Sequence, residues 1–292
     1  MSNNDPIVNL DAFPPAKMAE QAENVGVTKA NLDFWTLFVL GILAGAFIAL
    51  GAVFSTTVTA GAEGHVYFGL GKLLGGLTFC LGLILVVLGG AELFTGNNLI
   101  IMAFVSGRVT VRQLLRNWII VYCGNFVGAI ATVYIMLLCR RYMFGQGIIW
   151  LNALTISHAK CSKPFIDLFA LGVMCNALVC LAVWLCMGAR TTTDKILSII
   201  FPITAFVACG FEHCVANMYY IPGAILAKSW LPPEIWQTIG KTAADFPHLT
   251  WYNFFFVNLV PVTLGNIVGG AFLVGFVYWF AYRRKHGWEI HF

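Results

Sequence analysis

The sequence predicts an all-α integral membrane protein of six membrane-crossing helices, arranged as an inverted repeat of three plus three with two broken helices. Of its 292 residues, 59% are hydrophobic and only 10% are charged, whereas a soluble domain usually carries about 25% charged residues. A soluble globule of this length cannot bury so much apolar surface, because many of its residues must face water. The composition therefore excludes a soluble enzyme, a nucleic-acid-binding protein and a disordered chain.

Four stretches without Asp, Glu, Lys or Arg each supply one complete crossing. A spanning helix needs about 20 consecutive apolar residues. The four stretches are residues 34–62, 117–139, 168–189 and 246–282. These runs are far longer than the strands of a membrane β-barrel and lack their period-two alternation, so we expect helices.

Two further apolar segments are each interrupted by one carboxylate. Residues 73–107 are broken only by Glu92, and residues 196–227 only by Glu212. Helix-breaking residues surround both acids: Gly89, Gly90 and Gly96 in the first segment, and Pro202, Gly210, Pro222 and Gly223 in the second. We expect each segment to cross the membrane once, as a discontinuous helix with a loop at membrane depth.

The two halves of the chain repeat three motifs in the same order. The motifs are Leu-Gly at 40–41 and 171–172, G-x-E-x4-N at 90–97 and 210–217, and G-N-x-V-G-small at 124–129 and 265–270. Three crossings per half is an odd number, so the second half must enter from the opposite side. Inverted repeats of this kind place the transported species near the midplane, where the broken helices meet.

The sequence divides into three parts. Residues 1–33 form an N-terminal segment with a short amphipathic helix, residues 34–282 form the channel domain, and residues 283–292 form a tail. The first 33 residues lack the apolar core of a signal peptide. Ten of the seventeen Lys and Arg residues lie on the side of the termini, which predicts cytoplasmic termini.

The expected intramembrane ionisable groups are Glu92, Glu212 and His213, and such groups are functional candidates because they are costly in lipid. An imidazole at the midplane can hold or release a proton near neutral pH, and an arriving anion would stabilise its charged form. For the two carboxylates we favour a structural role, in which each accepts backbone N–H bonds exposed by the broken helix. Asn176 and Asn266 either donate to the permeant or bond between helices.

Apolar and basic side chains complete the candidate path. Phe79, Leu83, Leu93 and Phe206 lie near the two breaks and could narrow a pore that rejects hydrated ions. Lys160, between the halves, could attract anions to one mouth. The nine cysteines show no metal-binding spacing, so we expect buried thiols, no metal and no cofactor; the pairing of Cys139 with Cys161 stays open.

Three segments together resemble the formate/nitrite transporter family, and in particular its bacterial formate channel branch. They are residues 90–97, 210–218 and 263–270, and the similarity covers nearly the whole chain. The resemblance implies a homopentamer in the bacterial inner membrane, with an aquaporin-like fold and a pore in each protomer. It implies an Ω loop at the first break, an S loop at the second, and an N-terminal helix that takes part in pH-dependent gating.

The resemblance also implies roles for individual residues. His213 corresponds to the family's central histidine and Thr95 to its Ω-loop threonine partner. The remaining correspondences are a constriction at Phe79, Leu83, Leu93 and Phe206, a vestibule lysine at Lys160, and polar pore residues at Asn176 and Asn266. One departure concerns the Ω loop, where Glu92 and then Gly96-Asn97 follow the pattern of many nitrite-type members and leave the preferred anion open.

These observations predict a formate channel in which His213, steadied by Thr95, protonates the anion before it crosses the apolar constriction. Nitrite or hydrosulfide is the alternative cargo of the same pore. A neutral-solute pore of the water or glycerol kind is less favoured, because the Asn-Pro-Ala pair is missing. An intramembrane hydrolase using Glu212 and His213 lacks both an H-E-x-x-H motif and a serine nucleophile motif.

Overall fold

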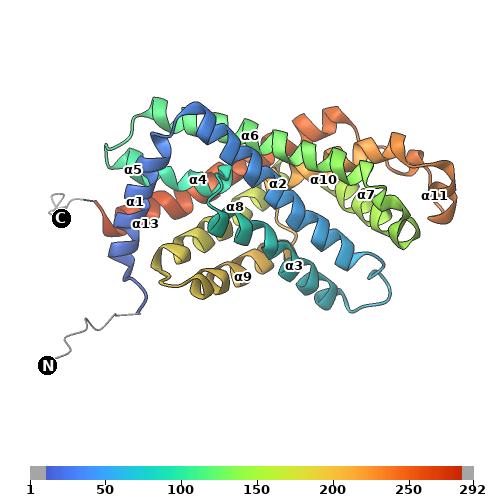
Figure 1. Ribbon diagram of the computed structural model, residues 1–292, viewed down its shortest axis with the longest axis horizontal. Coiled ribbons are helices and arrows are strands. Elements are labelled where there is room, and N and C mark those ends of the chain that lie inside the picture. The colour runs from blue at the N-terminus through green and yellow to red at the C-terminus, as the bar shows by residue number, and fades with distance from the viewer. Residues whose placement is uncertain (1–10, 285–292) are drawn as a thin grey trace, which may run out of the picture.

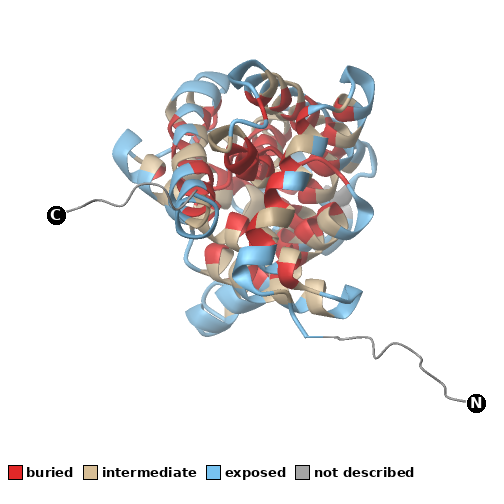
Figure 2. Ribbon diagram, turned by 90° about the vertical axis from the view of Figure 1, so that its left-hand side faces the viewer, coloured by how far each residue is buried: buried red, intermediate tan, exposed pale blue. Residues whose placement is uncertain are grey.

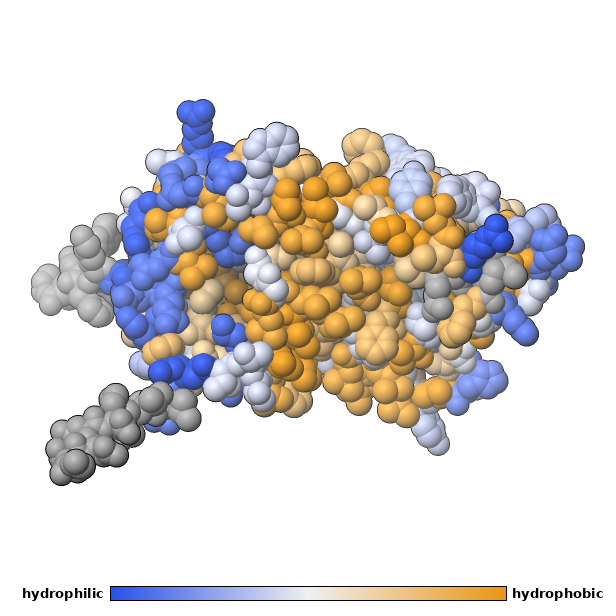
Figure 3. Space-filling model, viewed as in Figure 1, coloured by the Kyte–Doolittle hydropathy of each residue, from blue (hydrophilic) through white to orange (hydrophobic). Residues whose placement is uncertain are grey.

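The computed structural model describes residues 11–284, and for residues 141–143 it describes the backbone only. Every regular element in this part of the chain is helical, and the helices form one elongated bundle (Figure 1). Seen along the bundle, buried residues gather in its centre and exposed residues lie around its rim (Figure 2). The side view shows a broad hydrophobic band between two hydrophilic ends (Figure 3), as a bilayer requires.

The first half contains the predicted crossings and the first break. Its elements are α2 (Phe34–Thr59), α3 (Phe68–Gly89), α4 (Phe94–Asn97), η1 (Asn98–Ile100), α5 (Ile101–Val105) and α6 (Val111–Leu138). The Asp33 carboxylate caps α2 by accepting from the backbone N–H groups of Trp35 and Thr36. A capping box of Thr110 and Gln113 starts α6. The interruption between α3 and α4 is the predicted break at Glu92.

The second half follows the same plan. Its elements are α8 (Phe165–Gly188), α9 (Thr192–Ala208), α10 (Cys214–Trp230), and a last continuous helix made of η4 (Asn253–Leu259), α12 (Val260–Ile267), η5 (Val268–Phe276) and α13 (Val277–Tyr282). The η4 and η5 portions are π-helical, which the sequence did not predict. Within the described residues, five helices are long and apolar enough to cross a membrane, and we assign the sixth crossing to the α9–α10 pair, which contains the second break.

Close helix contacts repeat between the halves. A side chain at Gly124 of α6 would meet the Phe38 carbonyl oxygen of α2 at 2.8 Å. A side chain at Gly172 of α8 would meet the Val262 carbonyl oxygen of α12 at 2.8 Å. Small residues let membrane helices approach to this degree, so the repeated Gly motifs place equivalent helices in equivalent contact.

The two ends of the bundle differ in their covering elements. α1 (Pro15–Ala30) lies beside α5 and α13 at one end, which we call the terminal face (Figure 1). At the other end, the opposite face, lie α7 (Ile148–Lys160) and α11 (Pro233–Thr238), with the short turns η2 (Arg141–Gly147) and η3 (Ala243–Asp245). Of the predicted tail, only Arg283 and Arg284 fall within the described residues, and of the N-terminal segment, residues 11–33. All nine cysteines are described and free, so Cys139 and Cys161 do not pair.

Candidate functional site

Both broken helices turn through equivalent backbone conformations. Gly90 and Gly210 take positive φ values of 74° and 71°, a region that glycine enters without steric cost. The chain then runs extended, and the next N–H groups bond to the first crossing of their own half. Glu92 N donates to Leu40 O at 3.1 Å, and Glu212 N donates to Leu171 O at 3.3 Å.

One asparagine secures each break through three hydrogen bonds. The Asn125 amide donates to Gly41 O at 2.8 Å and Glu92 O at 2.9 Å, while its oxygen accepts from Phe94 N at 2.9 Å. The Asn266 amide donates to Gly172 O at 2.8 Å and Glu212 O at 2.9 Å, and its oxygen accepts from Cys214 N at 2.9 Å. These bonds satisfy backbone groups that an interrupted helix leaves free inside a membrane.

His213 lies at the N-terminus of α10, in the centre of the bundle. Its Nδ1 atom accepts from Ala216 N at 3.1 Å, and its Nε2 atom lies 3.0 Å from Thr95 Oγ1. A neutral imidazole has one donor and one acceptor nitrogen, so the backbone bond places the hydrogen on Nε2, where it donates to Thr95. The structure therefore brings His213 and Thr95, from the two different breaks, into direct contact.

Apolar side chains surround this imidazole. The Phe206 ring stacks near the His213 ring with centroids 5.8 Å apart, and it meets the Phe79 ring edge-on at 5.6 Å. Phe79, Leu83, Leu93 and Phe206 are each only 2–3% exposed. The four predicted constriction residues thus belong to one buried cluster, where an ion would lose its water of hydration.

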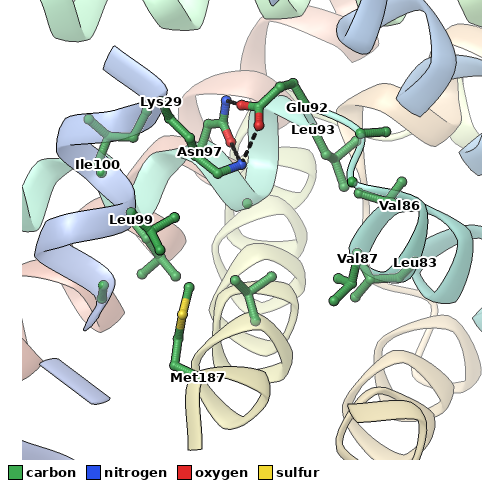
Figure 4. A pocket seen from close by; sticks show the side chains of 17 residues that line it. Lys29, Leu83, Val86, Val87, Glu92, Leu93, Asn97, Leu99, Ile100 and Met187 are labelled. Atoms are coloured by element: carbon green, nitrogen blue, oxygen red, sulfur yellow. Dashed lines mark hydrogen bonds and ion pairs between the residues drawn. The ribbon is translucent and has the colours of Figure 1, made fainter. Parts of the chain in front are cut away.

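A cavity of about 250 Å³ lies between α1 and two residues of this cluster, Leu83 and Leu93, which line it. Figure 4 shows its lining, with Leu83, Val86 and Leu93 on one wall and Met187 and Ile100 among the others. Residues of α1, including Lys29, form another part of its lining. The cavity reaches Leu83 and Leu93, so two of the constriction residues form its inner boundary.

Glu92 has different partners from those expected. Its carboxylate accepts from Lys29 Nζ at 2.7 Å and from the Asn97 amide at 2.7 Å (Figure 4). Lys29 Nζ also donates to Asn97 Oδ1 at 3.0 Å, and the Asn117 amide donates to Lys29 O at 2.9 Å. The expected backbone N–H bonds to the carboxylate are therefore wrong here, because a lysine from α1 is close enough to neutralise it.

Glu212 repeats this network from the opposite face. Its Oε2 atom accepts from Lys160 Nζ at 2.9 Å and from the Asn217 amide at 2.8 Å. The Asn258 amide donates to Lys160 O at 2.9 Å, as Asn117 does to Lys29. Glu212 also accepts from Lys163 Nζ at 3.1 Å, on Oε1. The backbone N–H expectation is wrong for this carboxylate as well, and both acids form buried ion pairs.

Asn176 does not present free amide hydrogens. Its amide donates to Asn266 O at 2.7 Å and to Asn98 Oδ1 at 3.0 Å. Of the two roles considered for Asn176 and Asn266, the geometry favours bonding between elements over donation to a permeant. Within the described residues, no three His, Cys, Asp or Glu side chains gather as metal ligands would.

Sequence reasoning missed four members of the two networks: Lys29, Asn117, Asn258 and Lys163. Lys29 lies in an amphipathic helix outside the crossings, where a lysine is usually solvated. A signal was nevertheless present in the repeat. Asn117 stands eight residues before Asn125, and Asn258 stands eight residues before Asn266, so aligning the halves over a longer window would have paired them.

Comparisons with known proteins place the chain among relatives of similar sequence and fold. Residues 16–280 match the sequence pattern of the family described as formate/nitrite transporter. The chain is 45% identical over 277 residues to the formate channel FocA of Escherichia coli (strain K12), covering 95% of this chain and 97% of that protein. It is 45% identical to FocA of Haemophilus influenzae, covering 90% and 93% of the two chains. A solved pentameric formate channel with formate bound superposes with a TM-score of 0.81 at 48% identity, covering 85% and 97%.

Proposed function

The chain belongs to the formate/nitrite transporter family, and from this premise we propose that it is a multi-pass membrane channel that passes formate. One observation carries the proposal: a buried imidazole stands between two lysine–carboxylate networks and beside a closed apolar constriction. The lysines can attract a small anion at each mouth, and the apolar cluster favours a neutral species at the centre.

The proposed passage converts formate into formic acid at the centre. Formate reaches the pore as an anion, since its pKa is about 3.5, near that of an α-carboxyl group. The N-terminus of α10 points its partial positive charge toward His213 and favours the anion there. A proton taken up from water on the proton-rich side charges the neutral ring at Nδ1. The imidazolium donates its Nε2 proton to a formate oxygen, the remaining ring proton returns to Nε2 so that Nδ1 again accepts from Ala216 N, and formic acid then passes Phe79, Leu83, Leu93 and Phe206. Direction follows the gradients of formate and protons.

The cap of α10 couples protonation to the anion. His213 Nδ1 accepts from Ala216 N–H at 3.1 Å, and a proton on Nδ1 would place two hydrogens between these nitrogens. Charging the ring therefore breaks the cap bond, which is favourable only when an anion lies beside the ring. This supports protonation upon arrival of formate over a permanently charged imidazole.

We infer the assembly and orientation from the relatives and the surface. A pentamer like the solved relative would cover part of the wide apolar band of the monomer (Figure 3). Cytoplasmic termini agree with the basic residues of the terminal face. Native mass spectrometry of the purified protein should detect a complex of five chains, and protease digestion of sealed, right-side-out cells should spare the termini.

The test of the proposed function is formate flux into proteoliposomes across a pH series. Wild-type protein should carry formate faster as the pH falls, while His213→Asn and His213→Phe should lose that pH dependence and most of the flux. Protein without formate flux would overturn the channel assignment. A His213 variant with unchanged flux and unchanged pH dependence would overturn only the proton relay.

Nitrite is the second candidate cargo. It is favoured by the sequence of the Ω loop, where Glu92 and then Gly96-Asn97 resemble many nitrite-type members. In this chain the Asn97 amide donates to the Glu92 carboxylate. Competition between labelled formate and unlabelled nitrite in one preparation separates the two. Inhibition at nitrite concentrations well below those of formate would make nitrite the preferred anion.

A further inference from the structure

Each half of the chain contains a matched network around its buried glutamate, so the halves serve as controls for one another. Both networks include a lysine whose backbone oxygen accepts from an asparagine, and a second asparagine that donates to the carboxylate. In the first half, one lysine and one asparagine supply a donor to each carboxylate oxygen. Lys29 occupies Glu92 Oε1 and Asn97 occupies Oε2, so both carboxylate oxygens have a donor.

The second half contains a lysine without a counterpart. Lys163 Nζ lies 3.1 Å from Glu212 Oε1, in addition to Lys160 Nζ at 2.9 Å from Oε2. The equivalent position three residues after Lys29 is Leu32, and the nearby Arg116 donates to the Leu32 carbonyl oxygen instead of to Glu92. The bonded network of the first half is thus neutral, whereas that of the second has two ammonium groups for one carboxylate.

The two lysines of the second network differ in exposure. The Lys160 side chain is 14% exposed and lies over the Tyr220 ring, with Nζ 5.6 Å from its centroid. The Lys163 side chain is 35% exposed. The unbalanced charge is therefore available to water at Lys163, at the outer edge of a network that ends at Glu212, the residue before His213.

We propose that Lys163 captures the permeant anion at the opposite face, with a positive charge that the Glu212 network leaves uncompensated. The identity of the anion rests on the proposed function, whereas the excess of two lysines over one carboxylate is independent of it. The competing role is purely structural: Lys163 Nζ donates to Glu212 Oε1, whereas Lys160 and Asn217 both donate to Oε2. A structural role and a capture role differ in their response to salt, because only capture acts through a water-exposed charge.

The first experiment measures formate uptake from each face separately, in membrane vesicles of defined sidedness. At low ionic strength, Lys163→Met should raise the half-saturating formate concentration from the opposite face about 3- to 10-fold, the effect of one charge acting over roughly 8–10 Å. The maximal rate and uptake from the terminal face should not change. The difference should nearly vanish at about 0.5 M salt, and Lys163→Arg should behave like wild type.

Two outcomes would overturn the capture role. One is an unchanged half-saturation from the opposite face. The other is a loss of maximal rate that is equal from both faces and insensitive to salt, as expected if Lys163→Met merely weakened the fold.

A second experiment does not depend on transport. A reporter thiol is placed beside the lysine as Ser162→Cys, in a background where the exposed Cys123, Cys139 and Cys209 are serine. The rates at which a negatively charged and a positively charged thiosulfonate reagent modify this thiol are measured. Lys163→Met should lower the ratio of the anionic to the cationic rate several-fold. An unchanged ratio would refute the proposal even if the protein carries formate, and a changed ratio would support it even if formate is not the cargo.

Discussion

His213 uses its two ring nitrogens for different purposes. Nδ1 caps α10 through Ala216 N, and Nε2 faces Thr95 from the other break. The first bond fixes the ring orientation, and the second directs the Nε2 hydrogen to the Thr95 hydroxyl oxygen. A residue that only capped the helix would not need a partner from the other half of the chain, so we propose that the Thr95 contact is the part of this geometry that serves transport.

Thr95→Val is the substitution that separates these purposes. Valine keeps the shape of threonine but removes the acceptor of the Nε2 hydrogen, which leaves a buried donor without a partner at a cost of about 1–3 kcal/mol. We expect formate flux in proteoliposomes to fall about 10-fold or more, while Thr95→Ser retains most of it. Equal flux in the valine and serine variants would contradict a role for the Thr95 hydroxyl.

His158 of α7 lies outside the membrane-crossing helices and responds to pH in its own way. Its ring lies 5.1 Å from the His248 ring and meets Phe246 edge-on at 5.8 Å, and its Nε2 atom is buried without a partner. Burial, then the nearby His248 and Lys228, lower the pKa of His158 from its ordinary value of 6.5. The folded protein thus binds fewer protons at this site than the unfolded chain as the pH falls below that value.

Stability must therefore decline on the acid side of the unfolded pKa of His158, because protonation favours the unfolded chain there. Above pH 7 the site has no effect. We predict that the Tm of wild-type protein in detergent falls between pH 7 and pH 5, and that the Tm of His158→Asn falls less over the same range. His65→Asn, at an exposed loop position, is the control and should follow wild type; parallel curves for all three proteins would contradict the assignment.

At the scale of the elements, helix pairs are held by glycine contacts that allow no added atoms. An added Cβ at Gly124 would lie 2.8 Å from Phe38 O and 3.0 Å from Gly41 Cα. Both atoms are backbone, so neither can rotate away, and α2 and α6 must separate. The same argument applies to Gly172 between α8 and α12.

Gly124→Ala should therefore destabilise the protein by about 1–3 kcal/mol through overpacking. Gly69→Ala is the matched control, because Gly69 is helical and nothing lies within 4 Å of its added Cβ. Alanine favours a helix over glycine by about 1 kcal/mol, so the control should keep or slightly raise its Tm in detergent. A Gly124→Ala protein as stable as Gly69→Ala would show that α2 and α6 are not in close contact.

The elements that the sequence predicted are those defined by local pattern. Charge-free length and the Gly-x-Glu motifs indicated the crossings and both breaks, because a buried carboxylate beside glycine cannot lie in a continuous lipid-exposed helix. α7 and α11 were missed, because they are short and of mixed polarity. The Lys29–Glu92 pair was missed for another reason: its members are 63 residues apart, and no local pattern records such a contact.

At the scale of the whole molecule, the two faces secure the breaks from outside. Lys29 reaches Glu92 from the terminal face, and Lys160 reaches Glu212 from the opposite face. α1 therefore does more than cover the 250 Å³ cavity, because its last turn supplies the charge that balances Glu92. Contacts that fix the position of α1 therefore also fix the position of Glu92 in the Ω loop. The contacts of Glu23 are of this kind.

Glu23 joins both ends of the described chain. It is 2% exposed, and its carboxylate accepts from Arg283 Nη2 at 3.0 Å and from Ser106 Oγ. The bond to Glu23 raises the pKa of Arg283 above its ordinary value. Trp279 Nε1 donates to the same Ser106 hydroxyl at 2.8 Å. One carboxylate of α1 thus connects the α5–α6 turn and the end of α13.

Glu23→Gln should loosen α1 as a unit. It removes the charge that pairs with Arg283, and because Arg283 is partly exposed we expect a local cost of about 1–2 kcal/mol. Hydrogen–deuterium exchange of residues 15–30 should then accelerate about 10-fold, and protection of the Ω loop around Glu92 should decline with it.

Lys17→Gln is the control, because it breaks the Lys17–Glu20 pair of the same helix, whose side chains are 46% and 41% exposed. Hydrogen–deuterium exchange of this variant should match that of the wild type. Equal exchange in both variants, or a loosened α1 with an unaffected Ω loop, would mean that α1 does not transmit its position to the central site.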